Sequence, residues 1–212
     1  QVSYGLPGFS PETGTIETVI GSDSLEIYGL TASTMYEAYV RAYYNGDSSI
    51  WIGPAQFHTH CIALTDNDLP YHENFASWTS TTNRNYCYTL NNSYDGSLSQ
   101  PSWVSTPSND STNSVYMYSG ATYASWMSLP AIDTYIPGLQ VSFSIYKTSS
   151  YEYPLAVGVM TNPNDLSTFD TVAVVKCVNT NRWENFVIPL SSHQGEGQYI
   201  TFLSPSGVAS GN

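Results

Sequence analysis

The chain has 212 residues, of which 10% are charged, and its 17 Asp and Glu against 5 Lys and Arg give a net charge of −12. So few cations cannot neutralise a run of phosphates, so we exclude nucleic acid as a partner and regard an anionic membrane surface as disfavoured. No stretch approaches the roughly 20 apolar residues that span a bilayer, and the start lacks a signal-peptide pattern, so we expect no membrane insertion.

Short alternating segments separated by turn residues recur along the chain, and no window sustains a helical apolar period. In the segment 35–43, Tyr36, Ala38 and Val40 share one face, and in the segment 139–145, Leu139, Val141 and Phe143 do so. The other predicted strands are 24–28, 115–118, 155–160, 171–178, 183–190 and 198–203. Many short strands of this kind predict β-sandwiches.

In the segment before residue 60, Leu30 and Tyr36 have the spacing of a tyrosine corner, in which a Tyr hydroxyl bonds back to the preceding turn. The strings YEAYVRA and SSIWIGPAQFHT come next, and GFSPETGT lies upstream. With these motifs the segment resembles the end of a fibronectin type III domain, in particular the version found in Bacteroidetes surface proteins. We expect core or corner roles for Tyr36, Trp51 and Phe57, because large aromatic residues are usually buried, and we expect Arg41 to stack on Trp51 as a cation–π pair.

The segment from Leu69 opens with the string LPYHENF and later contains GVMTNPNDLSTF and RWENFVIPL. With these strings it resembles a jelly-roll family of Bacteroidetes secreted proteins that includes the cleaved-adhesin modules of gingipains and is related in shape to MAM domains. LPYHENF is similar to the opening strand of that family. Such domains close with an acidic strand, and we expect this chain to lack it.

These segments together predict an all-β fold with two modules. We expect a partial immunoglobulin-like (fibronectin type III) sandwich at residues 1–60, a linker at 61–69 and a jelly-roll β-sandwich at 70–212. The chain is interpreted as a piece of a larger parent protein, because both modules are shorter than their families.

Three cysteines allow at most one internal disulfide. Cys61 and Cys87 flank the start of the second module and are the predicted pair, whereas Cys177 lies in an apolar run and is predicted to be a buried thiol. No C-x-x-C pair is present, and the H-x-H-C string from His58 to Cys61 lacks zinc-finger spacing, so zinc is not predicted.

A structural calcium ion is the cofactor that the jelly-roll resemblance implies. Relatives use the Glu of the opening E-N-F, which is Glu73 here, and Asp68 is a carboxylate nearby in sequence. Hard cations such as Ca²⁺ need six to eight oxygen ligands, so backbone carbonyls would complete the site.

Aromatic residues in the loop-rich middle of the chain are the candidate ligand-binding groups. Sugar-binding sandwiches stack sugar rings on Trp and Tyr and bind hydroxyls with Asn, Asp and Gln. We predict contacts from Tyr94, Trp103, Trp126, Asn92 and Asp95, within a wider set that includes Tyr116, Tyr118 and Tyr123. The competing interpretation is that most of these rings pack in the core.

Three D-S/T-hydrophobe triplets look like Bacteroidetes O-glycan acceptor sites, at Ser24, Ser111 and Thr171.

No catalytic motif is present, so we expect a non-catalytic adhesion or recognition segment, secreted or on the cell surface, that binds a glycan or a host protein. The alternatives are a structural spacer in a fibre or appendage and an accessory region of a secreted protease or glycosidase.

Overall fold

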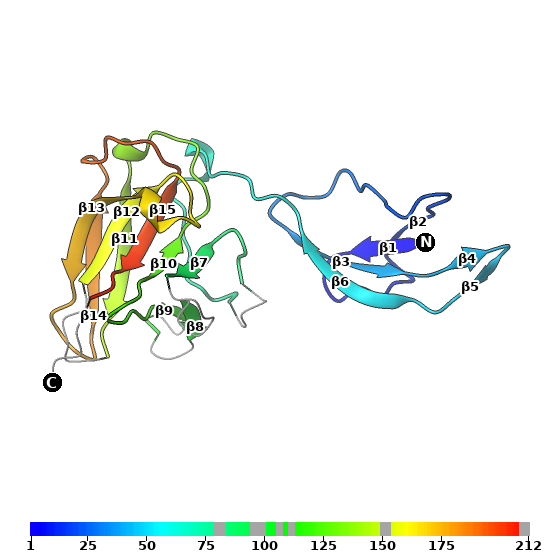
Figure 1. Ribbon diagram of the computed structural model, residues 1–212, viewed down its shortest axis with the longest axis horizontal. Coiled ribbons are helices and arrows are strands. Elements are labelled where there is room, and N and C mark those ends of the chain that lie inside the picture. Colours follow the sequence, from blue (N-terminus) through cyan, green and yellow to red (C-terminus); the bar gives the residue numbers. More distant parts are fainter. Residues whose placement is uncertain (79–83, 94–100, 105–107, 110–112, 149–153, 208–212) are drawn as a thin grey trace. The chain divides into compact units, whose positions relative to one another are not determined.

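The computed structural model describes residues 1–78, 84–93, 101–104, 108–109, 113–148 and 154–207. The chain divides into two compact units, Gln1–Ile62 and Ala63–Asn212 (Figure 1). The described parts are strands, turns and three-residue 3₁₀ helices, and none of these helices could span a membrane. The predicted all-β fold class is confirmed.

The first unit is built on one four-stranded antiparallel sheet in the order β2-β1-β3-β6. This is the C′-C-F-G order of one sheet of an immunoglobulin-like sandwich. Its strands are β1 (Val2–Gly5), β2 (Thr15–Glu17), β3 (Met35–Val40) and β6 (Ile52–His58), and a short ribbon of β4 (Tyr43–Tyr44) and β5 (Asp47–Ser48) lies between β3 and β6 in the sequence.

The loop between β1 and β2 folds over one face of this sheet. Phe9 packs edge-on against Tyr39, and the backbone N–H of Gly8 donates to the Glu37 carboxylate at 2.9 Å. The Ser3 hydroxyl donates to the carbonyl of Pro11 at 2.7 Å. These bonds explain how Ser3 and Glu37 are buried, since each polar group has a partner under the loop.

The opposite face of the sheet carries the apolar positions predicted for β3. Tyr36 is buried and stacks with Phe57, whereas Val40 is 50% exposed and its neighbour in register, Ile52, is 67% exposed. This face is therefore only partly covered. The predicted strand 24–28 does not form, because no neighbouring strand supplies a ladder, although its alternation persists in half-buried Leu25 and Ile27.

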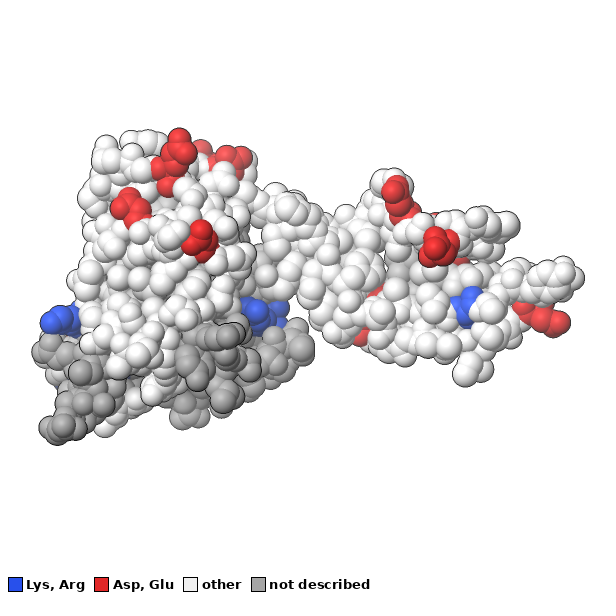
Figure 2. Space-filling model, viewed as in Figure 1, with Lys and Arg blue, Asp and Glu red and all other residues white. Residues whose placement is uncertain are grey.

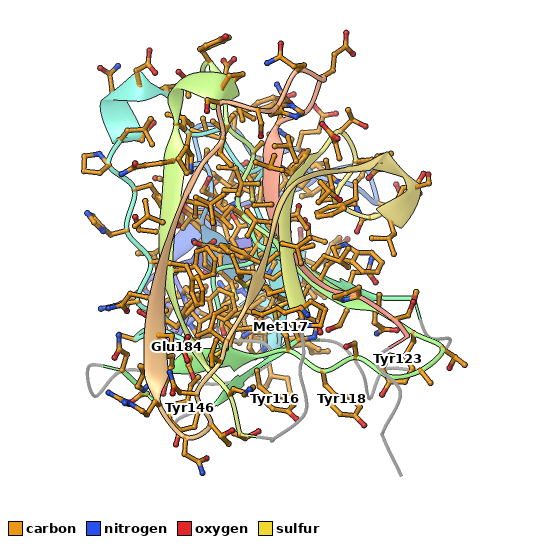
Figure 3. All side chains as sticks on the ribbon, turned by 90° about the vertical axis from the view of Figure 1, so that its left-hand side faces the viewer. Tyr116, Met117, Tyr118, Tyr123, Tyr146 and Glu184 are labelled. Carbon is orange, nitrogen blue, oxygen red and sulfur yellow. The ribbon has the colours of Figure 1, made fainter. Side chains whose placement is uncertain are left out.

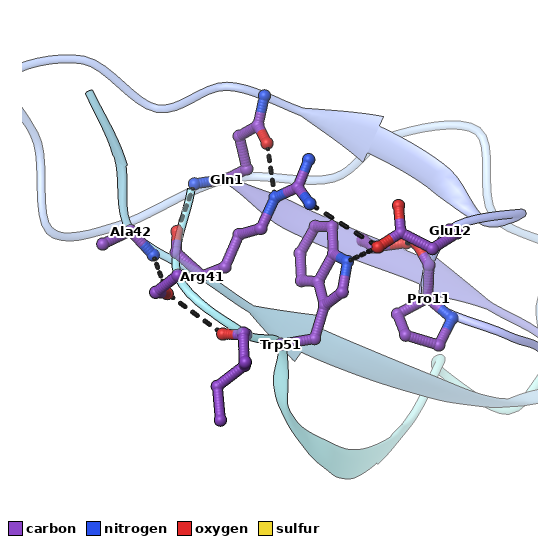
Figure 4. Close-up of polar contacts among 9 residues, drawn as sticks. Gln1, Pro11, Glu12, Arg41, Ala42 and Trp51 are labelled. Atoms are coloured by element: carbon purple, nitrogen blue, oxygen red, sulfur yellow. Dashed lines mark hydrogen bonds and ion pairs between the residues drawn. The ribbon is translucent and has the colours of Figure 1, made fainter. Parts of the chain in front are cut away.

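Arg41 and Trp51 form the predicted cation–π pair, with the guanidinium carbon 4.2 Å from the ring centre (Figure 4). Glu12 joins both partners: it accepts a hydrogen bond from Trp51 Nε1 at 2.8 Å and lies 3.6 Å from an Arg41 nitrogen. Arg41 Nε also donates to the Gln1 side chain at 2.8 Å. Together with Glu12, the pair therefore links three segments of the first unit: the one after β3, the one before β6 and the loop between β1 and β2.

The second unit is a sandwich of a five-stranded sheet, β13-β12-β15-β10-β7, and a two-stranded sheet, β11-β14. A further hairpin, β8-β9, lies at one end (Figure 1). The bounds are β7 (Thr89–Asn92), β8 (Ser102–Val104), β9 (Ser114–Tyr116), β10 (Ser125–Ser128), β11 (Gln140–Tyr146), β12 (Pro154–Met160), β13 (Phe169–Lys176), β14 (Trp183–Pro189) and β15 (Tyr199–Ser204). The 3₁₀ helices are η1 (Asp66–Asp68), η3 (Ile136–Gly138) and η4 (Leu166–Thr168).

The main core lies between these two sheets. Val157 and Val159 of β12 are fully buried there, and Phe143 of β11 meets Phe202 of β15 edge-on at 4.9 Å between ring centres. The alternation predicted for 139–145 is confirmed, because Leu139, Val141 and Phe143 all pack against this core.

A second, smaller core covers the outer face of the five-stranded sheet. Trp126, Met160 and Leu203 are buried there, and Leu166 and Phe169 from the β12–β13 connection pack on them. That connection contains the N-P-N-D string, in which Asp165 begins η4 by accepting a hydrogen bond from the N–H of Ser167 at 3.0 Å.

The predicted linker 61–69 lies mostly inside the second unit. The N–H of Leu64 donates to Ala131 at 2.7 Å, and Leu64 accepts from the N–H of Asp133 at 2.7 Å. Leu64 also pairs with Ile132 and packs against the main core. The second compact unit begins at Ala63.

Candidate functional site

A row of tyrosines lies at the end of the second unit that carries β9. Tyr116 is 44% exposed and Tyr118 is 48% exposed, and their nearly parallel rings are 6.4 Å apart between centres. Tyr123 is half-buried and follows with its ring centre 5.9 Å from that of Tyr118. We call Tyr116, Tyr118 and Tyr123 the tyrosine row (Figure 3).

The position of the tyrosine row follows from the alternation of core-facing and surface-facing side chains along this segment. Val115 and Met117 pack against the main core, so the residues between and after them, Tyr116 and Tyr118, point to the other side. The apolar anchors make the backbone of this segment a fixed support, and the two rings stand on it at the surface. A strand of alternating aliphatic and tyrosine residues is the sequence signal for this row.

A turn brings the third ring to the row. The N–H of Gly120 donates to the carbonyl of Tyr123 at 3.0 Å, and a Cβ on Gly120 would lie 2.5 Å from the Tyr123 ring. Any side chain at Gly120 would therefore displace the ring, so the glycine sets its position.

A second ring pair lies at the same end of the unit. Tyr146 ends β11 and pairs in register with Trp183, their ring centres 5.3 Å apart. Figure 3 shows Tyr146 and Glu184 at the same end as the tyrosine row. The Glu184 carboxylate accepts hydrogen bonds from the N–H groups of Asn179 and Val178, and the Asn179 N–H contributes most to lowering the pKa of this carboxyl.

Trp126, one of the predicted ligand contacts, is a buried residue. It is only 3% exposed, and its Nε1 donates to the carbonyl of Pro163 at 2.8 Å. Its position on the outer face of the sheet, under the β12–β13 connection, leaves no ring surface for a ligand. The sequence pattern could not separate this core ring from the surface rings near it.

The other predicted ligand contacts stay predictions. Tyr94 and Asp95 lie outside the described residues, and Trp103 is described only as a backbone position of β8, paired with Val115. Asn92 ends β7 and is half-buried, in register with Ser125.

The predicted calcium ligands are both engaged in local turns. Asp68 accepts from the N–H and the hydroxyl of Thr65, each at 2.8 Å, which lowers the pKa of the Asp68 carboxyl. Glu73 accepts from the N–H of Phe75 at 2.7 Å. No group of three or more His, Cys, Asp or Glu side chains gathers as a metal site within the described ranges, His58 and His60 included. Calcium therefore stays a prediction.

A buried histidine at the opposite end of the unit lies beside an aspartate, as the histidine of a catalytic triad does. His193 Nδ1 is 2.8 Å from an Asp170 oxygen, and the ring is buried beside an open hollow that Tyr135 and Glu196 also line. A serine or cysteine activated by this histidine would bond to Nε2. His193 Nε2 is buried and has no hydrogen-bond partner among the described atoms, so the pair is not arranged as a triad.

Charged residues are unevenly distributed on one face of the second unit. On this face, Figure 2 shows Asp and Glu at the end with the η1 and η4 turns and Lys and Arg nearer the other end, the end at which the tyrosine row and Glu184 lie (Figure 3). The acidic turns carry Asp66, Asp68 and Asp165.

The predicted modification sites and cysteines are placed as follows. Ser24 and Thr171 are exposed, and Ser111 lies outside the described residues. Cys177 is a buried free thiol, as predicted, and its burial raises its pKa. The pairing of Cys61 with Cys87 stays a prediction.

No family model and no curated protein sequence matches this chain. One similar solved structure comes from work described as the structural basis for the promiscuous specificity of carbohydrate-binding modules of the β-sandwich superfamily. It is 11% identical with a TM-score of 0.38, and the alignment covers 80% of this chain but only 65% of that one. The fold assignment therefore rests on the strands and sheets themselves.

Proposed function

We propose that this chain is a non-catalytic recognition segment of a secreted or surface-displayed protein, and that it binds glycans through the tyrosine row. The observation that carries the proposal is the exposure of Tyr116 and Tyr118 on a segment whose alternate residues are anchored in the core. Large apolar rings at a surface are available for contact, and their hydroxyl groups add hydrogen bonds at the edge.

Sugars fit this row better than the other common stacking ligands. Nucleic-acid bases also stack on aromatic rings, but that mode depends on a cationic groove along the phosphates. With 5 Lys and Arg in the chain and a net charge of −12, such a groove is not available. A pyranose presents an apolar C–H face and carries no required charge, so it can stack on tyrosine without phosphate neutralisation.

The same proposal includes the family relationships and the setting. The four-stranded order of the first unit and the tyrosine corner at Tyr36 support a fibronectin type III relationship, and the two-sheet second unit supports a jelly-roll adhesin. The low charged fraction of 10% and the exposed acceptor triplets at Ser24 and Thr171 support an extracellular, O-glycosylated protein. Intact-mass measurement of the natively produced protein would detect the glycans.

Structural calcium also belongs to this proposal, with Glu73 and Asp68 among its oxygen ligands. An ion that binds only the folded chain raises the unfolding temperature. We expect a higher unfolding temperature in excess Ca²⁺ than in chelator, with the difference reduced by Glu73→Gln. Identical melting curves in both conditions would exclude the site.

A glycan array probed in the presence of Ca²⁺, followed by titration with a sugar that binds, tests the proposal. Binding should be lost in the variant Tyr116→Ala/Tyr118→Ala and kept in Tyr44→Ala, because Tyr44 is 78% exposed in the first unit and far from the row in sequence. If no glycan binds, the row instead serves a protein partner or a spacer role, and the glycan proposal is wrong.

A further inference from the structure

The three rings of the tyrosine row are spaced at regular steps. The centres of Tyr116 and Tyr118 are 6.4 Å apart, close to the advance of about 6.6 Å for two residues of an extended chain. Tyr123 continues the row with a similar step of 5.9 Å. The distance between Tyr116 and Tyr118 is therefore set by the extended backbone, and the distance between Tyr118 and Tyr123 is set by the turn at Gly120.

The orientation of the rings changes along the row. Tyr116 and Tyr118 are within 12° of parallel, whereas Tyr123 is tilted by 48° from Tyr118. A rigid flat ligand that lies on the first two rings cannot also lie flat on the third. A ligand that stacks on all three rings must bend or twist between the second ring and the third.

From this geometry we infer that the row takes at least three consecutive units of a linear, twisted oligosaccharide, one unit on each ring. This inference rests on the proposed glycan binding. A pyranose and a tyrosine ring are similar in size, and the ring-to-ring steps are similar to the length of one hexose unit in an extended chain. Affinity then accumulates along the chain instead of coming from one deep pocket.

A row of this kind differs from a site for a single sugar. Pockets that capture one small molecule are concave and direct several polar groups at it. The open hollow with His193 and Glu196 has that composition, but it is lined by η3 and the β14–β15 loop and not by the tyrosine row. The tyrosines offer repeated contacts of one type, which select for chain length and shape.

Calorimetric titration with two oligosaccharide series, each from one to four glucose units, tests the inference. The β-1,3-linked series forms twisted chains and the β-1,4-linked series forms flatter ones. We expect affinity for the twisted series to rise by roughly threefold to tenfold with each unit up to the third and then to level off. We expect a smaller gain at the third unit in the flat series.

Variants of Tyr123 separate the contribution of the third ring to binding from that of the first two rings. Tyr123→Ala should remove the gain at the third unit and leave binding of the two-unit sugar unchanged, and Tyr123→Phe should keep the gain. Tyr135→Ala is the matched control, since Tyr135 is a 75% exposed tyrosine on η3's N-terminal side. Circular dichroism of each variant checks that the fold is intact.

The outcomes distinguish this inference from the proposed function. If sugars bind but the affinity is the same for one unit and three, or if Tyr123→Ala weakens every length equally, the three-unit row is wrong and glycan binding stands. If the flat series gains as much at the third unit, the twist is wrong. If no sugar in either series or on the array binds, the proposed function fails and this inference fails with it.

Discussion

The hydroxyl of Tyr36 accepts a hydrogen bond from the N–H of Thr31 at 3.1 Å. This bond closes the turn before β3 and is the contact that the spacing of Leu30 and Tyr36 predicts. The corner therefore fixes where the chain enters the sheet of the first unit.

Removal of that hydroxyl should destabilise the first unit. We expect Tyr36→Phe to lower its free energy of unfolding by about 1 kcal/mol, the usual contribution of one hydrogen bond, because the ring and its stacking on Phe57 remain. Tyr44→Phe is the control, as Tyr44 is 78% exposed. Chemical denaturation gives both values, and equal stability of the two variants would contradict a role for the corner.

The buried carboxylate of Glu37 should make the first unit sensitive to acid. Its hydrogen bond from the Gly8 N–H, and then that from Gln56, hold the Glu37 pKa below its ordinary value of 4.5. A pKa that is lowered by folding gives stability that is complete above the unfolded pKa and is lost as the pH falls through the folded pKa. We expect wild type to exceed Glu37→Gln in stability at neutral pH.

The difference between wild type and Glu37→Gln should then shrink as the pH falls below about 4.5, because protonation removes the charge that the variant already lacks. Thermal unfolding at a series of pH values measures this difference. Asp47→Asn, a change of charge at an exposed residue of β5, is the control. A difference that does not vary with pH would show that the Glu37 charge contributes nothing.

Trp126 should behave as a core residue and Tyr116 as a surface residue. We expect Trp126→Ala to destabilise the second unit by about 3–5 kcal/mol through the cavity it leaves, and Tyr116→Ala to change stability by no more than about 0.5 kcal/mol. Trp126→Phe should have an intermediate effect, since it keeps most of the volume but loses the bond to Pro163. Denaturant titration of the three variants tests the order, and a mild effect of Trp126→Ala would return this ring to the candidate ligand contacts.

Two sequence patterns explain which strands could be predicted. The strand predicted at 155–160 is β12, Pro154–Met160, whose continuous apolar run is typical of a buried strand. The strand predicted at 183–190 is β14, Trp183–Pro189, in which half-buried and exposed residues alternate. The segment 24–28 has the same alternation without forming a strand, since a ladder needs a neighbour that local sequence does not report.

The candidate site was harder to predict than the fold. Tyr116 and Trp126 both belong to aromatic, turn-rich sequence, yet one ring is 44% exposed and the other 3%. The difference comes from a distant segment, the connection that carries Pro163 and covers Trp126. Local sequence gives the face of a strand on which a ring lies, but the cover over that face is decided by tertiary packing.

The pairing of Cys61 with Cys87 is the last prediction, and it can be tested by counting thiols. Under denaturing conditions without reductant, we expect only Cys177, a free thiol in the structure, to react with a thiol reagent, and all three cysteines to react after reduction. Peptide mapping should then find Cys61 linked to Cys87. Because a disulfide restricts the unfolded chain, Cys61→Ala/Cys87→Ala should lower the free energy of unfolding by about 2–4 kcal/mol. The control Cys177→Ala should leave the disulfide between Cys61 and Cys87 intact. Three reactive thiols without reductant in protein produced under oxidising conditions would show that the bridge is absent.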